Sequence, residues 1–366
     1  MSKIAAPFIK GLSLCETFFK EAVKPILLQH FPHLSYSAGR LGSGSDVLGF
    51  DTERSRDHDW GPRCTLFLSE EDIGLREEIV SVLSSHLPKS ICGYPTNYGR
   101  HEDGTLNLCP STDGMVHHAV SVTTVEEFFV SYLGFYPAVD LSIFQWLHVP
   151  QQRLLIIKKG KVFHDDLNLL LPLKERLFWY PKDLWFFLMA NAWRRLAQEE
   201  PFMGRCGEEG DEIGSRLVAS RLLIEVMRIS FLQERVYAPY FKWFGRAFSE
   251  LECAKELSPL IIAVQQAANW KEREKHLCPI YECLVEKHNA LQVTTVVEAK
   301  VSPFHSRPYL VIHGDRISDL LHEKIISPEV KSFERNIGSI DQFVDNTDVL
   351  SYPKTWSKVC ALHNKD

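Results

Sequence analysis

The chain has 366 residues, 45% of them hydrophobic, so we expect two globular domains with sizeable cores. Its formal net charge of −6 lacks the basic excess of general nucleic-acid-binding proteins, and we do not expect a nucleic-acid partner. The longest apolar cluster, residues 184–192, is too short to cross a membrane, so we expect no membrane association.

The cysteines and the first residues predict the compartment. The chain has nine cysteines, an odd number, and no C-x-x-C pair, so we expect free thiols in a reducing environment. Pro7 and Lys10 interrupt the stretch where a signal peptide would have its apolar region. These observations predict a cytoplasmic protein. The cysteines are Cys15, Cys64, Cys92, Cys109, Cys206, Cys253, Cys278, Cys283 and Cys360.

The first predicted element is an amphipathic helix over residues 8–29, where apolar residues recur at helical spacing. Pro25 lies inside this helix, and we expect it to kink or split the helix. A strand over residues 34–41 follows and leads into a turn that begins with Gly42 and Ser43. The backbone N–H groups of this turn, from Gly42 through Ser43, Gly44 and Ser45, are suited to hold phosphate.

Two acidic residues, Asp57 and Asp59, follow the turn and directly precede the apolar run Cys64–Leu68, which is typical of a strand. If both acids belong to that extended segment, their side chains point to the same face, because they are two residues apart. Two carboxylates aimed at one point are stabilised by a cation between them. Mg²⁺ prefers such oxygen ligands and also takes substrate phosphates.

This order of Gly42-Ser43, a spacer and Asp57-x-Asp59 resembles the signature of the DNA polymerase beta superfamily of nucleotidyltransferases, which includes the aminoglycoside nucleotidyltransferases. The longer string from Gly42 to Arg63 resembles one branch of it, an uncharacterised domain-of-unknown-function family with a nucleotidyltransferase-like domain. The resemblance continues in residues 122–125, 210–215, 237–243, 304–308 and 338–342.

The resemblance implies a nucleotidyltransferase that moves a nucleoside monophosphate, which we expect to be AMP, from ATP or another nucleoside triphosphate to a small-molecule or protein acceptor. Asp57 and Asp59 would be catalytic and would bind the metal, Mg²⁺ with Mn²⁺ as an alternative. Gly42, Ser43, Gly44 and Ser45 would hold the phosphates. Transfer to RNA is a weaker third hypothesis, because the composition shows no basic excess.

The superfamily usually places a third acid on a later strand, and this chain departs from that pattern. We predict the strand over residues 116–125, where Ser121 stands at the expected position. A serine hydroxyl is no base at neutral pH. The alternative hypothesis is therefore a nucleotide-binding pseudoenzyme with a regulatory role.

Another side chain could replace the missing base. His117 shares a face of the predicted strand with Ser121, and its imidazole would titrate near neutrality. Glu126 and Glu127, at the start of the next helix, are further candidates. An ordinary hydrogen-bonded histidine is the simpler interpretation of His117.

Between these segments, a helix is predicted from about Ser69 to Leu87, and a long loop over residues 89–114 that is rich in Gly, Pro, Asn and Thr. Such a loop either covers the cleft or is a surface excursion. The later segment Leu154–Phe163, with Lys159-Gly160 at its centre, predicts a hairpin.

Strand patterns then give way to helical ones. Helices are predicted over residues 172–178, 182–199, 213–235, 238–251, 257–269, 272–289, 315–325, 328–335 and 339–346. The predicted fold class is α+β: a nucleotidyltransferase-like α/β domain with a small mixed sheet over residues 1–150, then a helical bundle domain over 151–366 that begins with the short hairpin.

The resemblance also implies that the helical domain supplies a positive side chain to the triphosphate and an aromatic ring to the base. Lys242 and Tyr237, in the aromatic-rich stretch 237–243, are the candidates for nucleotide binding. Packing of the helical bundle explains the same pattern equally well.

Overall fold

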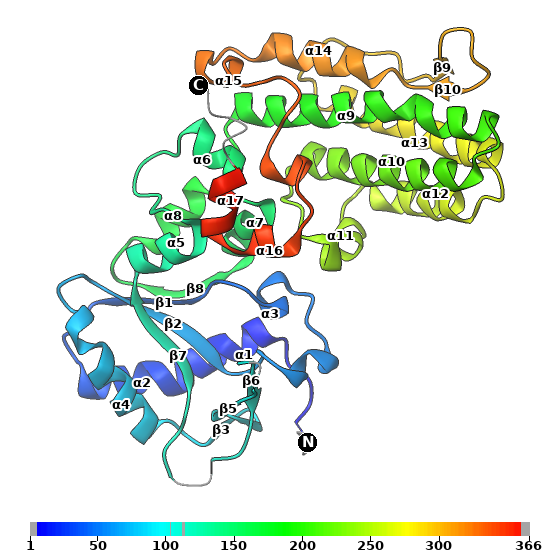
Figure 1. Ribbon diagram of the computed structural model, residues 1–366. Helices are drawn as coiled ribbons and strands as arrows, with labels where there is room; N and C mark the ends of the chain where they lie inside the picture. Colours follow the sequence, from blue (N-terminus) through cyan, green and yellow to red (C-terminus); the bar gives the residue numbers. More distant parts are fainter. Residues whose placement is uncertain (1–5, 103, 112–113, 360–366) are drawn as a thin grey trace. The chain divides into compact units, whose positions relative to one another are not determined.

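The computed structural model describes residues 6–102, 104–111 and 114–359. The chain divides into two compact units (Figure 1). Unit 1 is Met1–Asp140 with Arg153–Phe178, and unit 2 is Leu141–Gln152 with Trp179–Asp366. The short segment Leu141–Gln152 thus belongs to unit 2 although both of its sequence neighbours belong to unit 1. The predicted boundary after residue 150 falls near the end of this segment.

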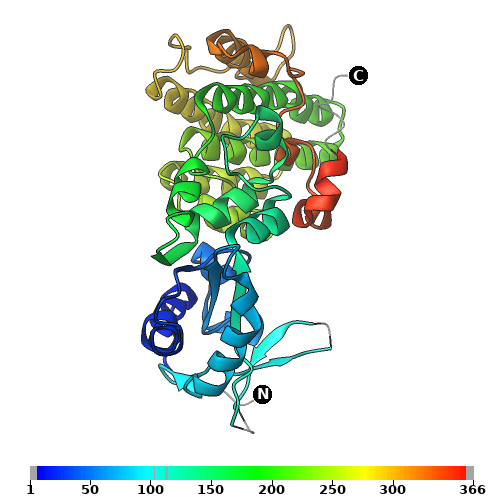
Figure 2. The same ribbon diagram turned by 90° about the vertical axis from the view of Figure 1, so that its left-hand side faces the viewer.

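Unit 1 begins with the predicted amphipathic helix, which the structure confirms (Figure 2, dark blue). It consists of α1 (Gly11–Phe18), a π-helical segment (Phe19–Val23) and α2 (Lys24–His30). Pro25 lies in the first turn of α2, directly after the π-helical segment. A proline without an N–H is tolerated there, and the wider π turn takes up the irregularity in the hydrogen-bond ladder.

The sheet of unit 1 has four strands in the order β7-β2-β1-β8. Strand β2 is parallel to β7, and β1 is antiparallel to both β2 and β8, so the sheet is mixed, as predicted. The strands are β1 (Tyr36–Arg40), β2 (Arg63–Leu68), β7 (Ala119–Thr124) and β8 (Lys161–Asp165).

The core of unit 1 lies on one face of this sheet. Side chains at alternate positions of β1, β2 and β7 pack with α1, α2 and α4 (Arg76–His86) in one buried cluster. The strand residues of that cluster are Tyr36, Ala38, Cys64, Leu66, Leu68, Val120 and Val122. The intervening positions point to the opposite face, where Thr65 is partly exposed and Ser121 is exposed, whereas Ser37 and Phe67 are buried.

In its described residues, the predicted long loop contains only short strand pairs, as expected. Two antiparallel pairs form within it. They are β3 (Ser90–Ile91) with β4 (Tyr94–Pro95), and β5 (Tyr98–Arg100) with β6 (Leu106–Leu108). Unit 1 also contains α3 (Ser45–Leu48), α5 (Val125–Leu133), α8 (Leu170–Arg176) and most of α7 (Gln151–Lys159), with 3₁₀ turns at Glu53–Asp57 and Ile73–Leu75.

The hairpin predicted around Lys159-Gly160 is wrong. Gln151–Lys159 forms helix α7, and only the segment after Gly160 is extended, as β8. The apolar run Leu154–Ile157 is fully buried, and a short buried run of this kind has the same pattern in a strand and in a helix. Helix α7 turns directly into β8 at Gly160. A residue with a side chain would be too close to the sheet there, because its Cβ would lie 2.9 Å from the carbonyl oxygen of Arg40.

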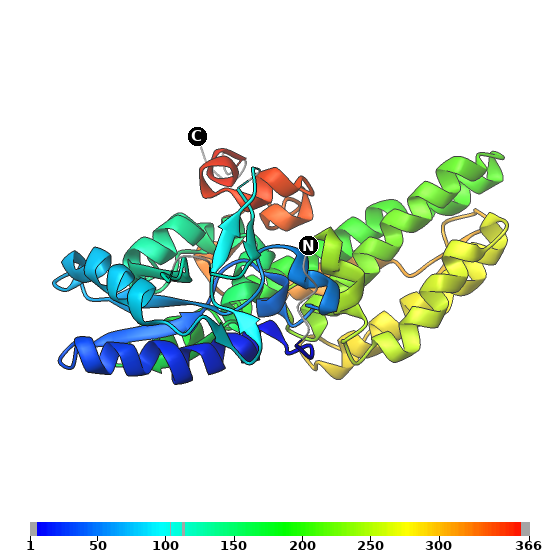
Figure 3. The same ribbon diagram turned by 90° about the horizontal axis from the view of Figure 1, so that it is seen from below.

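Unit 2 is mostly helical, which confirms the predicted fold class. Helix α9 packs against α10 and α14, and α13 packs against α10 and α12 (Figures 1 and 3). The helices predicted over residues 182–199, 213–235, 272–289 and 315–325 are confirmed as α9, α10, α13 and α14. Helix α9 extends further than predicted, because it continues past Pro201. The helices are α6 (Ile143–His148), α9 (Lys182–Glu208), α10 (Glu212–Gln233), α11 (Phe241–Phe248), α12 (Ala254–Gln266), α13 (Trp270–Ala290), α14 (Gly314–Lys324), α15 (Pro328–Lys331), α16 (Thr347–Ser351) and α17 (Pro353–Val359).

Two short elements complete unit 2, the strand pair β9 (Ser302–Pro303) with β10 (Leu310–Val311) and a 3₁₀ turn at Ile340–Gln342. None of the helices in the described ranges is both long enough and apolar enough to span a bilayer. The cysteines within those ranges are free thiols, and Cys360 lies outside the described residues.

Candidate functional site

The glycine-bearing turn lies between β1 and α3, within unit 1. Gly42 has φ 91° and Gly44 has φ 156°, conformations that residues with a side chain rarely adopt. A Cβ on Gly44 would also collide with the carboxylate of Asp46 and the guanidinium of Arg40. The turn therefore requires glycine both for its backbone conformation and for the close approach of charged groups.

Those charged groups form a buried cluster. Arg40 Nε lies 2.9 Å from Asp46 Oδ2, and Arg63 Nη2 lies 3.0 Å from Asp46 Oδ1. Burial alone would raise the pKa of Asp46, but the charges and hydrogen bonds of Arg40 and Arg63 outweigh it and hold the pKa below its ordinary value. Arg40 also donates to the carbonyl oxygens of Leu41 (2.8 Å) and Ser43 (2.7 Å), so it fixes the path of the turn.

Sequence analysis did not identify this cluster. Arg40 and Asp46 are only 7% and 1% exposed, and the residue types flanking a turn do not reveal which of them are buried together. The available indication was the unusual density of charge around Gly42–Ser45, with arginines at the end of one strand and the start of the next.

Helices α5 and α7 place further side chains beside the turn. The ring of Phe128 lies 3.8 Å from the position of a Cβ on Gly42, and it stacks on Tyr132 with centroids 5.7 Å apart. The Arg153 guanidinium lies 4.4 Å from the Tyr132 ring centroid. Burial raises the pKa of the Tyr132 phenol, and Arg153 and Ser43 partly offset this shift. Arg40 and Arg63 thus lie at the turn and share the carboxylate of Asp46, while Arg153 lies against Tyr132 beside it.

The predicted placement of Asp57 and Asp59 on a strand is wrong. Asp57 ends a 3₁₀ turn, Asp59 has φ 46°, and β2 begins only at Arg63. The chain bends between Asp59 and the start of β2, because Gly61 has φ 132° and Pro62 follows it. Asp57 and Asp59 therefore do not share one face of a strand.

Both carboxylates already have partners in the protein. Asp57 Oδ1 accepts from its neighbour's backbone, His58 N at 3.0 Å, and lies 3.1 Å from His58 Nδ1, while 54% of the side chain is exposed. Asp59 Oδ1 accepts from Leu106 N at 3.1 Å, and Asp59 N donates to Leu106 O at 2.7 Å. Asp59 therefore fastens the short strand β6 to this loop.

The fit to a metal ion is partial. Within the described ranges, no group of three or more His, Cys, Asp or Glu side chains is placed to hold a metal. Asp57 and Asp59 supply carboxylate oxygens of the kind that Mg²⁺ takes, and Mg²⁺ often uses one or two carboxylates with water and substrate phosphates as its other ligands. These two residues could thus hold Mg²⁺ only together with such ligands.

The face of the sheet opposite the core carries hydroxyl groups on β2 and β7. Ser121 on β7 is exposed and pairs in register with Thr65 on β2. At the positions of β2 that share this face, the residues are Arg63, Thr65 and Phe67, so neither β2 nor β7 presents a carboxylate there. The acid missing from the sequence at residue 121 is therefore not replaced by a neighbouring strand position.

The proposed substitutes for that acid lie elsewhere. His117 precedes β7, which begins at Ala119, so its predicted placement on the strand with Ser121 is wrong; its backbone N–H donates to Asn97 Oδ1 at 2.7 Å. Glu127 closes a capping box with Thr124 at the start of α5. Hydrogen bonds from the Thr123 hydroxyl and Thr124 N–H, with the charge of Arg76, lower the pKa of Glu127. This carboxylate has a structural role.

The two residues expected to bind the nucleotide from the helical half belong to unit 2. Tyr237 is fully buried, with its ring 4.8 Å from Trp179 and 5.1 Å from Tyr180, and burial raises its pKa well above the ordinary value. Its ring faces are therefore used in packing. Lys242 is exposed on α11, with its Nζ 5.3 Å from the Trp243 ring.

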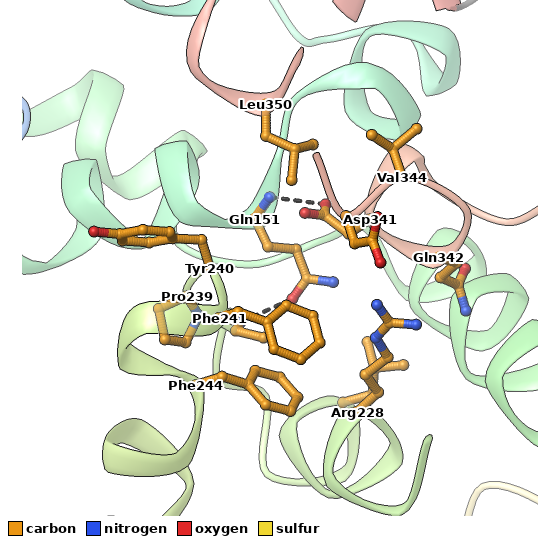
Figure 4. Close-up of a pocket in the computed structure, with 13 residues that line it drawn as sticks. Gln151, Arg228, Pro239, Tyr240, Phe241, Phe244, Asp341, Gln342, Val344 and Leu350 are labelled. Atoms are coloured by element: carbon orange, nitrogen blue, oxygen red, sulfur yellow. Dashed lines mark hydrogen bonds between the residues drawn. The ribbon is translucent and has the colours of Figure 1, made fainter. Parts of the chain in front are cut away.

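Residues next to Tyr237 line a small pocket within unit 2 (Figure 4). Gln151 lies at its centre: its backbone N–H donates to Asp341 Oδ2 (2.9 Å), and its Oε1 accepts from Ala238 N (2.9 Å). Burial raises the pKa of Asp341 to about 6. The cavity holds about 50 Å³, whereas a cavity that admits benzene has about 150 Å³. A nucleobase does not fit there.

Comparisons with known proteins give limited likenesses. A family model described as "Domain of unknown function (DUF4037)" matches residues 146–244. No curated protein matches the chain. A solved structure, a nucleotidyltransferase-like protein from Exiguobacterium sibiricum, is 12% identical and covers 75% of this chain and 74% of its own, with a TM-score of 0.30. The chain thus resembles an uncharacterised family over part of its length, and its likeness to a nucleotidyltransferase-like protein is weak.

Proposed function

We propose that unit 1 binds a nucleoside triphosphate at the turn Gly42–Ser45. The observation that carries this proposal is the charge around the turn, where Arg40, Arg63 and Arg153 lie near a backbone that glycine keeps thin. Asp46 pairs with both Arg40 and Arg63, so one carboxylate is shared by two guanidinium groups at the turn. Backbone N–H groups of a glycine-bearing turn and arginine side chains are the groups that bind phosphate.

Within this proposal the residues have distinct roles. Arg40 and Asp46 hold the turn in shape, because both are buried and bonded to each other. Arg63 and Arg153 supply charge that attracts the phosphates. Asp57 and Asp59 would hold Mg²⁺ together with phosphate oxygens, and the ion would neutralise part of the triphosphate charge.

Binding without turnover is the form of this function that the sheet face supports best. Nucleotidyl transfer needs a group that activates the acceptor, and on β2 and β7 this face carries the hydroxyls of Thr65 and Ser121 instead of a carboxylate. This form of the function is a nucleotide-binding protein with a regulatory role. Transfer of a nucleotidyl group, such as AMP, to a small molecule or protein is the second candidate, favoured by the solvent exposure of Asp57.

Calorimetry with each nucleoside triphosphate, with and without Mg²⁺, tests the proposal. We expect binding that Mg²⁺ strengthens, and we expect Arg153→Gln to weaken it at least about tenfold, since it removes a charged hydrogen-bond donor. Arg246→Gln on α11 is the matched control, because Arg246 is an exposed arginine of unit 2 that pairs only with Glu250 in the described part of the chain. Absence of triphosphate binding by the folded wild-type chain would overturn the proposal.

The two forms of the function differ in their products. Pyrophosphate is measured in the same samples after candidate acceptors are added. Release that is lost in Asp57→Asn/Asp59→Asn would favour transfer, whereas tight binding without release favours the regulatory form. The double variant separates the two acids from the arginines, because it leaves the cluster around Asp46 intact.

A further inference from the structure

Unit 2 contains a cleft that no motif of the sequence indicated. Helix α9 lines it with Asn191, Arg194, Arg195 and Glu199, and α10 adds Arg221. The segment 336–343, which precedes and includes the 3₁₀ turn, lines it as well. The cleft has a volume of about 420 Å³, which lies within the range of small-molecule sites, roughly 300–1,000 Å³.

The cleft presents positive charge. Arg194, Arg195 and Arg221 line it together with one carboxylate, Glu199. Arg221 binds Glu199 through both Nε, at 2.8 Å, and Nη2. Glu199 therefore neutralises the charge of Arg221 and not that of Arg194 or Arg195.

Carboxylates outside the lining offset this charge only in part. Arg194 is paired with Asp319 at 3.6 Å, and both side chains are partly exposed. Arg195 lies 3.0 Å from Glu225, but Glu225 also pairs with Arg228 at 2.8 Å. Within ion-pair distance, four guanidinium groups therefore share three carboxylates, while Asp345 acts on Arg221 and Asp341 on Arg228 from further away. Because each guanidinium carries five N–H donors, N–H groups of Arg194 and Arg221 remain available to an anion.

A buried hydrogen-bond acceptor in the same cleft places a second requirement on the ligand. Asn191 is 4% exposed; its Nδ2 donates to the carbonyl oxygen of Phe187 at 2.8 Å, which fixes the orientation of the amide. Its Oδ1 is buried and has no hydrogen-bond partner among the residues that the structure describes. A buried acceptor without a donor is costly, so this oxygen favours a ligand that brings a hydroxyl or N–H group.

We propose that this cleft binds a small phosphate monoester with a hydroxylated carbon skeleton. The phosphate dianion would lie against Arg194 and Arg221, whose planar guanidinium groups bind phosphate through paired hydrogen bonds. A hydroxyl of the ligand would donate to Asn191 Oδ1. Sugar phosphates and nucleoside monophosphates share this chemistry. The site lies wholly within unit 2, so it does not depend on nucleotide binding by unit 1.

Calorimetry on the full chain tests the proposal with four probes: a hexose 6-phosphate, adenosine 5′-monophosphate, inorganic phosphate and the unphosphorylated hexose. We expect at least one monoester to bind more tightly than inorganic phosphate, and the hexose not to bind. Arg194→Gln should weaken that binding at least about tenfold, because it removes a charged donor. Arg246→Gln should leave it unchanged, and a thermal melt of each variant reports folding.

Arg221→Gln is the second variant, so a folding defect in Arg194→Gln does not stop the test. Monoester binding that neither variant weakens would overturn the assignment to this cleft. Inorganic phosphate that binds as tightly as the monoesters would overturn the role of Asn191. Binding of the adenosine ester alone, lost in Arg153→Gln and kept in Arg194→Gln, would assign it to the turn of unit 1 and overturn the cleft.

Discussion

At the residue scale, Asp46 is a buried charged group of unit 1 that two arginines hold in place. Its carboxylate is buried between Arg40 and Arg63, and both arginines are held by it in return. Removing one member of a buried ion pair leaves the other charges without compensation, which costs about 3–5 kcal/mol. We therefore expect Asp46→Asn to lower the free energy of unfolding by about this amount at pH 7.

Urea denaturation at pH 7 measures the effect, with Asp140→Asn as the control because Asp140 is fully exposed. The pKa of Asp46 is below its ordinary value of 3.8, so its contribution to stability is present above that value and is lost as the pH falls through the folded-state pKa. The difference between wild type and Asp46→Asn should therefore shrink in strong acid. A constant difference from pH 7 to pH 2 would contradict this explanation.

The pKa of Glu200 on α9 is shifted in the opposite direction to that of Asp46. Its carboxylate is buried and accepts from Ile312 N (2.7 Å) and Gly314 N (3.2 Å), and burial raises its pKa to about 7 against these hydrogen bonds. Because the folded state holds the proton more tightly, this group stabilises fully below its ordinary pKa of 4.5 and loses that contribution as the pH rises towards 7.

We predict that the urea midpoint of the wild type loses part of its value between pH 5 and about 7.5, and that Glu200→Gln removes this part of the pH dependence. The control is Glu323→Gln, since Glu323 is exposed on α14, and it should keep the wild-type profile. Identical pH profiles for wild type and Glu200→Gln would show that another group causes the dependence.

At the scale of elements, the junction of α7 with β8 depends on Gly160. A Cβ at this position would lie 2.9 Å from Arg40 O and 3.0 Å from Ile156 O, which are both backbone atoms that cannot give way easily. We expect Gly160→Ala to destabilise the protein by about 1–3 kcal/mol, because overpacking forces the backbone to shift. The measurement is the free energy of unfolding in urea.

Gly245→Ala is the matched control. Gly245 lies within helix α11, and a Cβ there meets no atom within 4 Å. Alanine in an open helical position is neutral or stabilises by roughly 0.4–1 kcal/mol. Equal effects of the two substitutions would mean that the tight junction at Gly160 does not limit stability.

The segment Gly338–Gln342, which matched the resembled family by sequence, has a structural role at the same scale. Gln342 Nε2 donates to Leu188 O at 3.2 Å, Arg195 donates to Gln342 O, and Asp341 accepts from Gln151 N. The segment thus joins α9 to the start of α7 and lines both the small pocket and the arginine-lined cleft.

At the scale of the whole molecule, the chain does not divide at one point. Unit 1 obtains its strand β8 from residues after the segment Leu141–Gln152, which belongs to unit 2. We expect a fragment of residues 1–178 to unfold cooperatively in urea, and a fragment of residues 1–150 not to, because the latter lacks the strand that pairs with β1. Cooperative unfolding of both fragments would contradict this expectation.

The sequence by itself determined the nature and order of most elements. The amphipathic helix at the N-terminus, the strands before the turn and around Ser121, and the long helices of unit 2 follow from periodicity, because the spacing of apolar residues reports which face of a segment is buried. The mostly helical second half was predicted for the same reason, whereas the small mixed sheet was expected from the resemblance to nucleotidyltransferases. Glycine at positions 42 and 44 predicted the turn, since positive φ angles favour glycine.

Only the tertiary structure decided where single side chains lie. Asp57 and Asp59 precede the strand because Gly61 and Pro62 bend the chain. Leu154–Ile157 is helical although a run buried on both faces fits a strand equally well. Arg40, Asp46 and Arg63 meet because two strands and a turn converge. The cleft around Arg194 depends on two helices and the segment 336–343. Such pairings join residues far apart in the sequence, and local periodicity carries no information about which distant segments pack together.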